Sequence, residues 1–139
     1  MGATPILDEA AALLSARYGK ELDDICVERI IVGVFFTGIK LTSGPGGIAY
    51  TPPESIQRAG TRILKGEKTM IRGMRAGDFI EHGAPGPFSD VIRLAAINAL
   101  SVPFLNKDQD SIIEGNDVTD HLEFFQDKRK CMVGAIIPT

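Results

Sequence analysis

The fold of this chain is decided by residues 25–50, which read ICVERIIVGVFFTGIKLTSGPGGIAY. From Ile25 to Leu41 most positions are β-branched or aromatic, a composition typical of β-strands. The stretch is too long for one ordinary strand, and Gly33 and Gly38 interrupt it. We therefore predict two antiparallel strands that turn near Phe36-Thr37-Gly38.

The residues that follow extend the same sheet. Ser43-Gly44-Pro45-Gly46-Gly47 has the composition of a loop, and Ile48-Ala49-Tyr50 then gives a short third strand. Pro52-Pro53 ends that strand, since proline cannot continue a hydrogen-bonded ladder. The expected product is a three-stranded antiparallel meander.

Helical patterns flank the meander on both sides. Apolar residues recur at helical spacing from Pro5 to Tyr18, where Thr4 can cap the start and Gly19 can end the helix. Four more short helices are predicted, at Pro53 to Ala59, at Ala76 to Glu81, at Asp90 to Leu100 (capped by Ser89 and stopped by Pro103) and at Thr119 to Phe125. Strands followed by helices indicate an α+β domain, with the helices packed on one face of the sheet.

A continuous apolar run over residues 131–137, Cys131-Met132-Val133-Gly134-Ala135-Ile136-Ile137, predicts a C-terminal strand that is covered on both faces. Such a strand needs neighbours beside it and layers above and below it. We expect the earlier part of the chain or another copy to supply them, so the chain would be a module that another body completes.

Composition limits the class of protein. The 139 residues fit one domain, and a net charge of −3 argues against a general nucleic-acid binder. No apolar run approaches the roughly 20 residues that a membrane-spanning helix needs. Asp8 and Glu9 precede the first apolar stretch, unlike a secretory signal, so we expect a cytoplasmic protein without membrane partners. In that compartment Cys26 and Cys131 are expected to be buried, reduced thiols.

The glycine-rich loop at residues 42–47 is the first candidate site. Closely spaced glycines allow backbone N–H groups to approach a ligand, and a nest of such groups favours an anion. A plain hairpin connection explains the same glycines, and both interpretations stay open. The candidate ligand-binding residues here are Ser43, Gly46, Gly47, Tyr50 and Thr51.

Asn98 is the second candidate, since it interrupts the apolar helix Leu94-Ala95-Ala96-Ile97-Asn98-Ala99-Leu100. A buried amide needs a hydrogen-bond partner, which would be a neighbouring backbone group or a ligand. Glu28 and Arg29 interrupt an apolar strand, where an exposed sheet face or a cleft would explain them. No cysteine or histidine shows metal-ligand spacing, and no catalytic residues can be named.

The chain resembles a bacterial and archaeal family described as putative heavy-metal chelation proteins. The resemblance rests on four segments, Gly47-Ile48-Ala49-Tyr50-Thr51, Gly73 to Phe79, Leu94 to Leu100, and Met132-Val133-Gly134-Ala135 with Pro138. It implies an N-terminal domain like that of enolase over residues 1–127. Residues 128–139 would then begin a Rossmann-like domain, whose remainder does not follow. Arg93 stands where the family is expected to carry a glycine.

The resemblance also implies a site between the two domains, with a transition-metal ion as candidate cofactor. Three functions stay open. The chain is a small-ligand or metal-binding module whose site another domain or subunit completes, with a Rossmann-like domain or a homodimer as partner. Alternatively it is half of a split lyase or transferase for a small anionic metabolite. The third reading is a non-catalytic, homo-oligomeric assembly module that pairs through its terminal strand.

Overall fold

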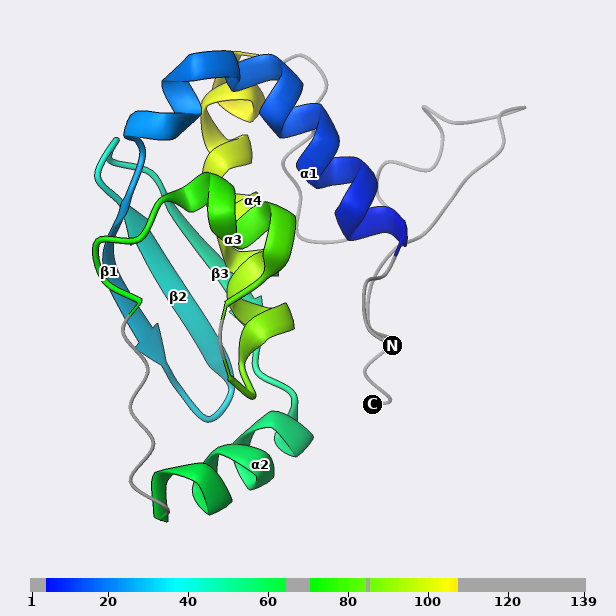
Figure 1. Cartoon of the computed structure of the whole chain (residues 1–139), viewed down its shortest axis with the longest axis vertical. Helices are drawn as coiled ribbons and strands as arrows, with labels where there is room; N and C mark the ends of the chain where they lie inside the picture. Colours follow the sequence, from blue (N-terminus) through cyan, green and yellow to red (C-terminus); the bar gives the residue numbers. More distant parts are fainter. Residues whose placement is uncertain (1–4, 65–70, 85, 108–139) are drawn as a thin grey trace, which may run out of the picture. The chain divides into compact units, whose positions relative to one another are not determined.

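The computed structural model describes residues 5–64, 71–84 and 86–107, with the side chains of 61–64 left out. Figure 1 shows their arrangement. The elements are α1 (Pro5–Tyr18), a short 3-10 helix (Gly19–Asp24), β1 (Val27–Val32), β2 (Phe36–Leu41), β3 (Gly46–Tyr50), α2 (Pro53–Leu64), α3 (Ala76–His82) and α4 (Ser89–Lys107). The predicted α+β class is confirmed, and so is the first helix with its bounds.

The three strands form one antiparallel sheet in the order β1-β2-β3, which confirms the predicted meander. The predicted turn at residues 36–38 is wrong, because Phe36 and Gly38 lie in β2, paired with Tyr50 and Ile48 of β3. The first hairpin instead turns at residues 33–35, closed by the N–H of Gly33, which donates to the Phe36 carbonyl at 2.9 Å. The turn therefore uses Gly33 and not Gly38.

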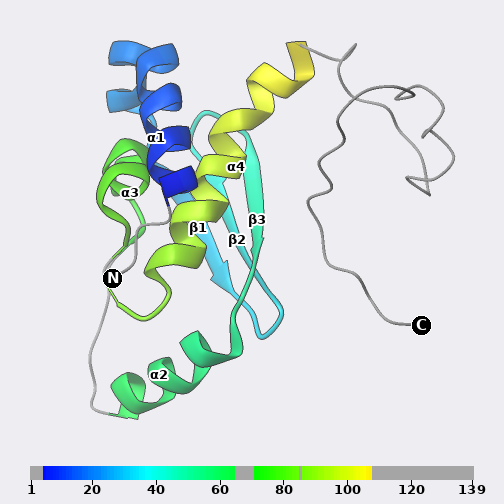
Figure 2. The ribbon, with the colours of Figure 1, turned by 90° about the vertical axis from the view of Figure 1, so that its right-hand side faces the viewer.

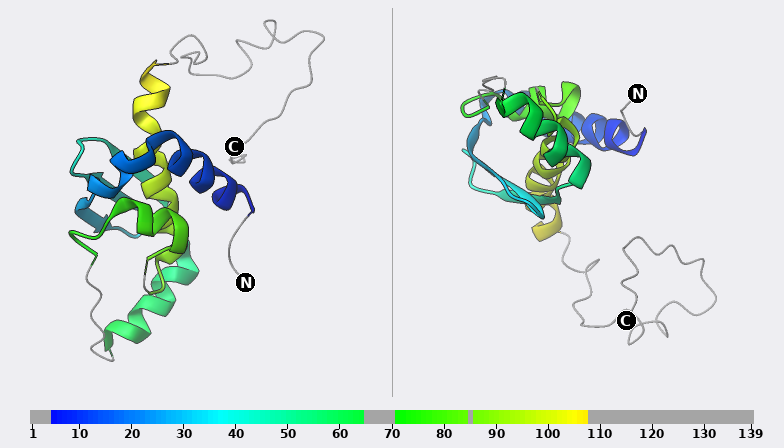
Figure 3. Two further views of the ribbon diagram at one scale, coloured as in Figure 1. Left: turned by 45° about the horizontal axis from the view of Figure 1, so that its top comes forward. Right: turned by 90° about the horizontal axis from the view of Figure 1, so that it is seen from below.

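Among the described elements, the helices cover one face of the sheet and leave the other face open. The covered face carries Val27, Ile39, Leu41 and Ala49, all buried, and α4 packs against β2 and β3. Helices α1 and α3 pack in turn on α4. Figures 2 and 3 show the three helices on one side of the sheet, with α4 next to the strands. The prediction that helices pack on one face is thus confirmed.

Helix α4 lies very close to β3 because both elements present small residues. Ala95, Ala96 and Ala99 are fully buried on the helix, and Gly47 faces them from the strand. A side chain at Gly47 would overlap the Ala95 carbonyl oxygen and come within 2.5 Å of the Ala99 nitrogen. Gly47 is therefore required by this helix–sheet contact.

The predicted end of α4 at Pro103 is wrong, because the helix runs through the proline to Lys107. A proline inside a helix removes one hydrogen bond and costs about 3 kcal/mol. The last turns make contacts that offset this cost: the ring of Phe104 packs edge-on against Tyr18 at 5.2 Å, and Arg17 lies 4.9 Å from the centre of the Phe104 ring. Tertiary packing thus overrides a local stop signal. Helix α2 likewise extends past its predicted end at Ala59.

Buried polar groups tie the core together. Thr37 and Thr51 are fully buried, with their hydroxyl oxygens 2.9 Å apart. Arg93 is also buried; its Nε donates to the Ile80 carbonyl at 2.8 Å and its Nη2 to a carboxylate oxygen of Asp8 at 2.6 Å. Arg93 therefore connects α4 to α3 and α1.

The remaining sequence predictions concern the two cysteines, the C-terminal elements and membrane-spanning helices. Cys26 is a free thiol, half-buried where a buried one was expected. Cys131, the helix at 119–125, the strand at 131–137 and the domain boundary after residue 127 lie outside the described residues. No helix within the described ranges is long and apolar enough to cross a membrane.

Candidate functional site

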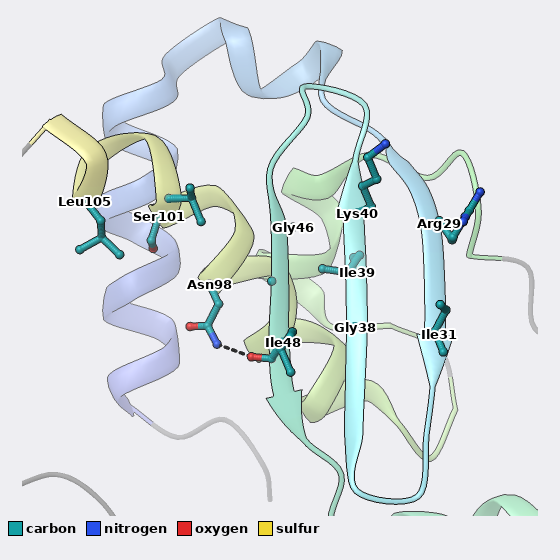
Figure 4. Close-up of a pocket in the computed structure, with 12 residues that line it drawn as sticks. Arg29, Ile31, Gly38, Ile39, Lys40, Gly46, Ile48, Asn98, Ser101 and Leu105 are labelled. Atoms are coloured by element: carbon teal, nitrogen blue, oxygen red, sulfur yellow. Dashed lines mark hydrogen bonds between the residues drawn. The ribbon is translucent and has the colours of Figure 1, made fainter. Parts of the chain in front are cut away.

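A groove of about 740 Å³ crosses the open face of the sheet and continues past β3 to the C-terminal half of α4. Figure 4 shows it from the open face. Its floor includes Ile31, Gly38 and Ile48 from the three strands, and its far wall is made by Ser101, Val102 and Leu105 of α4. Most of these side chains are apolar, so the groove favours an apolar ligand surface.

The alternation of the strands explains the shape of the floor. Residues of β2 and β3 point alternately to the covered and the open face. Gly38 stands on the open face between Ile31 and Ile48 in the register, and Gly46 stands beside Lys40. Because neither glycine has a side chain, the floor is hollowed between the two isoleucines and beside Lys40.

The end of the groove away from the first hairpin is positively charged. Arg29 and Lys40 are register partners and both line the groove. The Lys40 Nζ lies 3.1 Å from a carboxylate oxygen of Glu28, and both side chains are about half exposed. A smaller cleft of about 200 Å³ joins Glu28 and Arg29 to Arg72. Because three basic side chains lie near a single carboxylate, this end of the groove has a net positive charge, which favours an anionic ligand group.

The edge of the sheet beside α4 is closed at its centre. In the β2–β3 ladder, the N–H of Thr51 donates to the Phe35 carbonyl and the N–H of Leu41 to the Pro45 carbonyl. Alternation then directs the backbone groups of Gly46, Ile48 and Tyr50 away from β2. The Asn98 side-chain amide donates to the Ile48 carbonyl at 2.8 Å. The predicted backbone-tying role of Asn98 is therefore seen, although its side chain is exposed and not buried.

The structure brings three of the predicted site residues together, and separates the others from them. Gly46, Gly47 and Asn98 line the groove. Ser43 is exposed in the turn between β2 and β3, and Tyr50 is exposed on the open face at the end of β3. Thr51 is buried on the covered side.

The groove also contains residues that sequence reasoning did not select. Placing the first turn at residues 33–35 fixes the register of the sheet. Only then does Lys40 stand beside Arg29, and Ile31 on the same face as Ile48. Leu105 was missed because the helix was expected to stop at Pro103. A Gly33 turn followed by strict alternation was the signal that could have found the sheet residues.

The described residues do not fit a site for a bare heavy-metal ion. None of them form a group of three or more histidine, cysteine, aspartate or glutamate side chains that could hold a metal. Cys26, the one thiol among them, is half-buried and belongs to no such group. Heavy-metal sites are built from several converging donors. The described residues alone therefore do not form such a site.

Comparison with known proteins identifies the family. The family model described as "Putative heavy-metal chelation" matches residues 16–101, which run from the end of α1 to α4 and include the whole sheet. No curated protein and no solved structure matches the chain significantly. The match covers more than half of the sequence, so the chain belongs to the family described as "Putative heavy-metal chelation".

Proposed function

We propose that this chain is a small-ligand-binding module whose groove takes a small organic anion, in a site that another domain or subunit completes. The observation that carries the proposal is the composition of the groove. An apolar floor and wall, with Ile31, Ile48 and Leu105, meet a positively charged end at Arg29 and Lys40. A ligand with an apolar body and one acidic group would satisfy both parts.

The need for a second body follows from the openness of the groove. Ligand sites in proteins usually enclose most of the ligand surface. Here the sheet supplies a floor and α4 one wall, and none of the described residues that line the groove lies across from the sheet. A second domain or subunit over this face would remove the ligand from water and strengthen its attraction to Arg29 and Lys40, because charges interact more strongly at low dielectric.

The family description points to heavy-metal chelation, and this proposal is compatible with it in one form only. The described residues offer no donor set for a bare ion. A metal-binding role for this groove would therefore depend on donor atoms of the organic ligand, of the second body or of other residues of the chain. The groove itself would bind the organic part.

Fluorescence titration with 8-anilinonaphthalene-1-sulfonate tests the ligand class, since this probe combines an apolar ring system with one sulfonate. We expect saturable binding that Arg29→Gln/Lys40→Gln weakens at least fivefold and that salt weakens as well. Arg58→Gln, at an exposed position of α2, is the matched control and should bind as the parent chain does. Circular dichroism melts confirm that each variant is folded.

Equal probe affinity in the double variant and in Arg58→Gln would contradict the proposal, because the charged end would then play no part. A parallel calorimetric titration with nickel chloride alone separates the two ligand classes. Tight nickel binding by a chain that does not bind the probe would replace the organic anion with a bare metal ion.

A further inference from the structure

We propose that the open face of the sheet packs against the same face of a second copy of this chain, so that the second copy is the body that closes the groove. This inference deepens the proposed function. The claim that the second copy closes the ligand groove rests on that function, whereas the self-association depends only on the surface described next.

The open face carries large apolar side chains that are exposed. We call the residues of this surface the apolar face: Ile31, Phe36, Ile48 and Tyr50. Their exposed fractions run from 58% for Tyr50 to 64% for Ile48. Phe36 and Tyr50 are register partners, and Ile31 and Ile48 flank Gly38 on the same side of the sheet. The patch is therefore continuous across all three strands.

The exposed area suits a stable dimer. Four large apolar side chains at about 60% exposure present roughly 450 Å². A stable interface buries about 800 Å² on each partner, of which a little over half is apolar. The apolar face supplies about that apolar share, and the wall of the groove at Val102 and Leu105 adds to it. A single small ligand would leave most of it in water.

Each edge of the sheet already has a backbone group bonded to another part of the chain, which favours packing of a second copy on the face over extension of the sheet. At the β3 edge, Asn98 holds the Ile48 carbonyl. At the β1 edge, the N–H of Val27 donates to the Met74 carbonyl at 2.9 Å, and the N–H of Gly73 to the Val27 carbonyl at 2.8 Å. Strand addition would have to break these bonds, whereas face-to-face packing leaves them intact.

The distribution of charge favours a two-fold arrangement of identical faces. Arg29 and Lys40 lie at the end of the face away from the first hairpin, and Phe36 and Tyr50 lie at the end beside it. A two-fold axis that runs between the two sheets and across the strands reverses one copy relative to the other. Each positively charged end then lies near Phe36 and Tyr50 of the other copy, so like charges stay apart and a cation–π contact becomes available.

Sedimentation equilibrium of the full chain, from about 1 μM to about 300 μM without any ligand, measures this association. We expect a monomer–dimer equilibrium. Ile31→Asp/Ile48→Asp should weaken it at least 100-fold, since two central contacts are lost and replaced by charge. Ile31→Thr/Ile48→Thr keeps strand propensity and should weaken it at least tenfold, which covers the case in which the aspartate variant does not fold.

The matched control is Ile6→Asp, which alters a residue of α1 that is 77% exposed and lies off the face. It should dimerise as the parent chain does. A chain that is monomeric throughout, or a dimer that the threonine variant and Ile6→Asp leave equally stable, would overturn the inference. A monomeric chain whose probe binding still depends on Arg29 and Lys40 would overturn this inference alone, whereas a dimer that ignores the probe would overturn only the proposed function.

Discussion

Gly47→Ala should destabilise this protein severely although it adds a single methyl group. An alanine Cβ would overlap the Ala95 carbonyl oxygen and lie 2.5 Å from the Ala99 nitrogen and 3.0 Å from the Ala99 Cα. Unstrained contacts are about 3.5 Å, so α4 would have to move by more than about 1 Å. Ala95 and Ala99 are fully buried, and the atoms that obstruct the methyl group belong to helix backbone. They cannot move aside as a flexible side chain would.

Overpacking a core usually costs about 1–3 kcal/mol, and a clash with backbone belongs at or above the upper limit. We expect Gly47→Ala to lose about 3 kcal/mol or more, a large part of the 5–15 kcal/mol of a typical domain. For a domain of this size the melting temperature should fall by roughly 12 °C or more. Urea denaturation followed by far-ultraviolet circular dichroism measures both the midpoint and the free energy of unfolding.

Two neighbouring glycines provide the controls. A Cβ at Gly38 would meet nothing within 4 Å, and one at Gly46 would meet only the Ile39 carbonyl oxygen, at 3.3 Å. Gly38→Ala should be neutral or stabilise by about 0.5–1 kcal/mol, because alanine loses less backbone entropy on folding. If Gly47→Ala stayed within 1 kcal/mol of Gly38→Ala, the close approach of β3 and α4 would be refuted.

The remaining predictions concern buried polar groups. Thr37→Val or Thr51→Val alone should cost about 1–3 kcal/mol, since each leaves a buried hydroxyl without its partner, and the double variant in urea denaturation should cost less than the sum. Arg93→Lys should destabilise by about 2–3 kcal/mol in the same assay, because one ammonium cannot replace the guanidinium that reaches acceptors on both α1 and α3; parent-like stability would contradict this. Burial, helped by the nearby charge of Glu21, raises the pKa of Tyr18, so the neutral phenol is favoured in the folded state and its stabilising effect is lost as the pH rises through that raised pKa. Ultraviolet titration of a Tyr50→Phe variant, which leaves Tyr18 as the one tyrosine, should show a midpoint above 10, and a midpoint at or below 10 would contradict the partial burial of Tyr18.

Much of the fold could be predicted because local signals and tertiary structure agree. The helix at residues 5–18 follows from apolar spacing, and the meander follows from β-branched runs separated by glycines. The failures occur where two local signals compete. Gly33 and Gly38 are equal candidates for a turn in sequence, and the choice is decided by the pairing of Phe36 with Tyr50, which sequence alone does not reveal.

The candidate site was harder to predict because it is formed by elements distant in sequence. Asn98 was singled out as an amide within an apolar helix, and its bond to the backbone of β3 agrees with one of its two interpretations. The glycine loop was read as one unit, yet Gly47 serves helix packing while Gly46 lies on the groove floor. The far wall at Leu105 depends on contacts of Phe104 that stabilise α4 beyond Pro103, and no local pattern reports them.

The central claim is that the open face of the sheet is a binding surface. Methyl NMR of isoleucine-labelled protein tests it directly, because Ile31 and Ile48 lie on that face and Ile6 lies on α1. On serial dilution, and separately on addition of 8-anilinonaphthalene-1-sulfonate, the Ile31 and Ile48 methyl signals should shift while the Ile6 signal stays in place. Unchanged Ile31 and Ile48 signals in both experiments would contradict the claim.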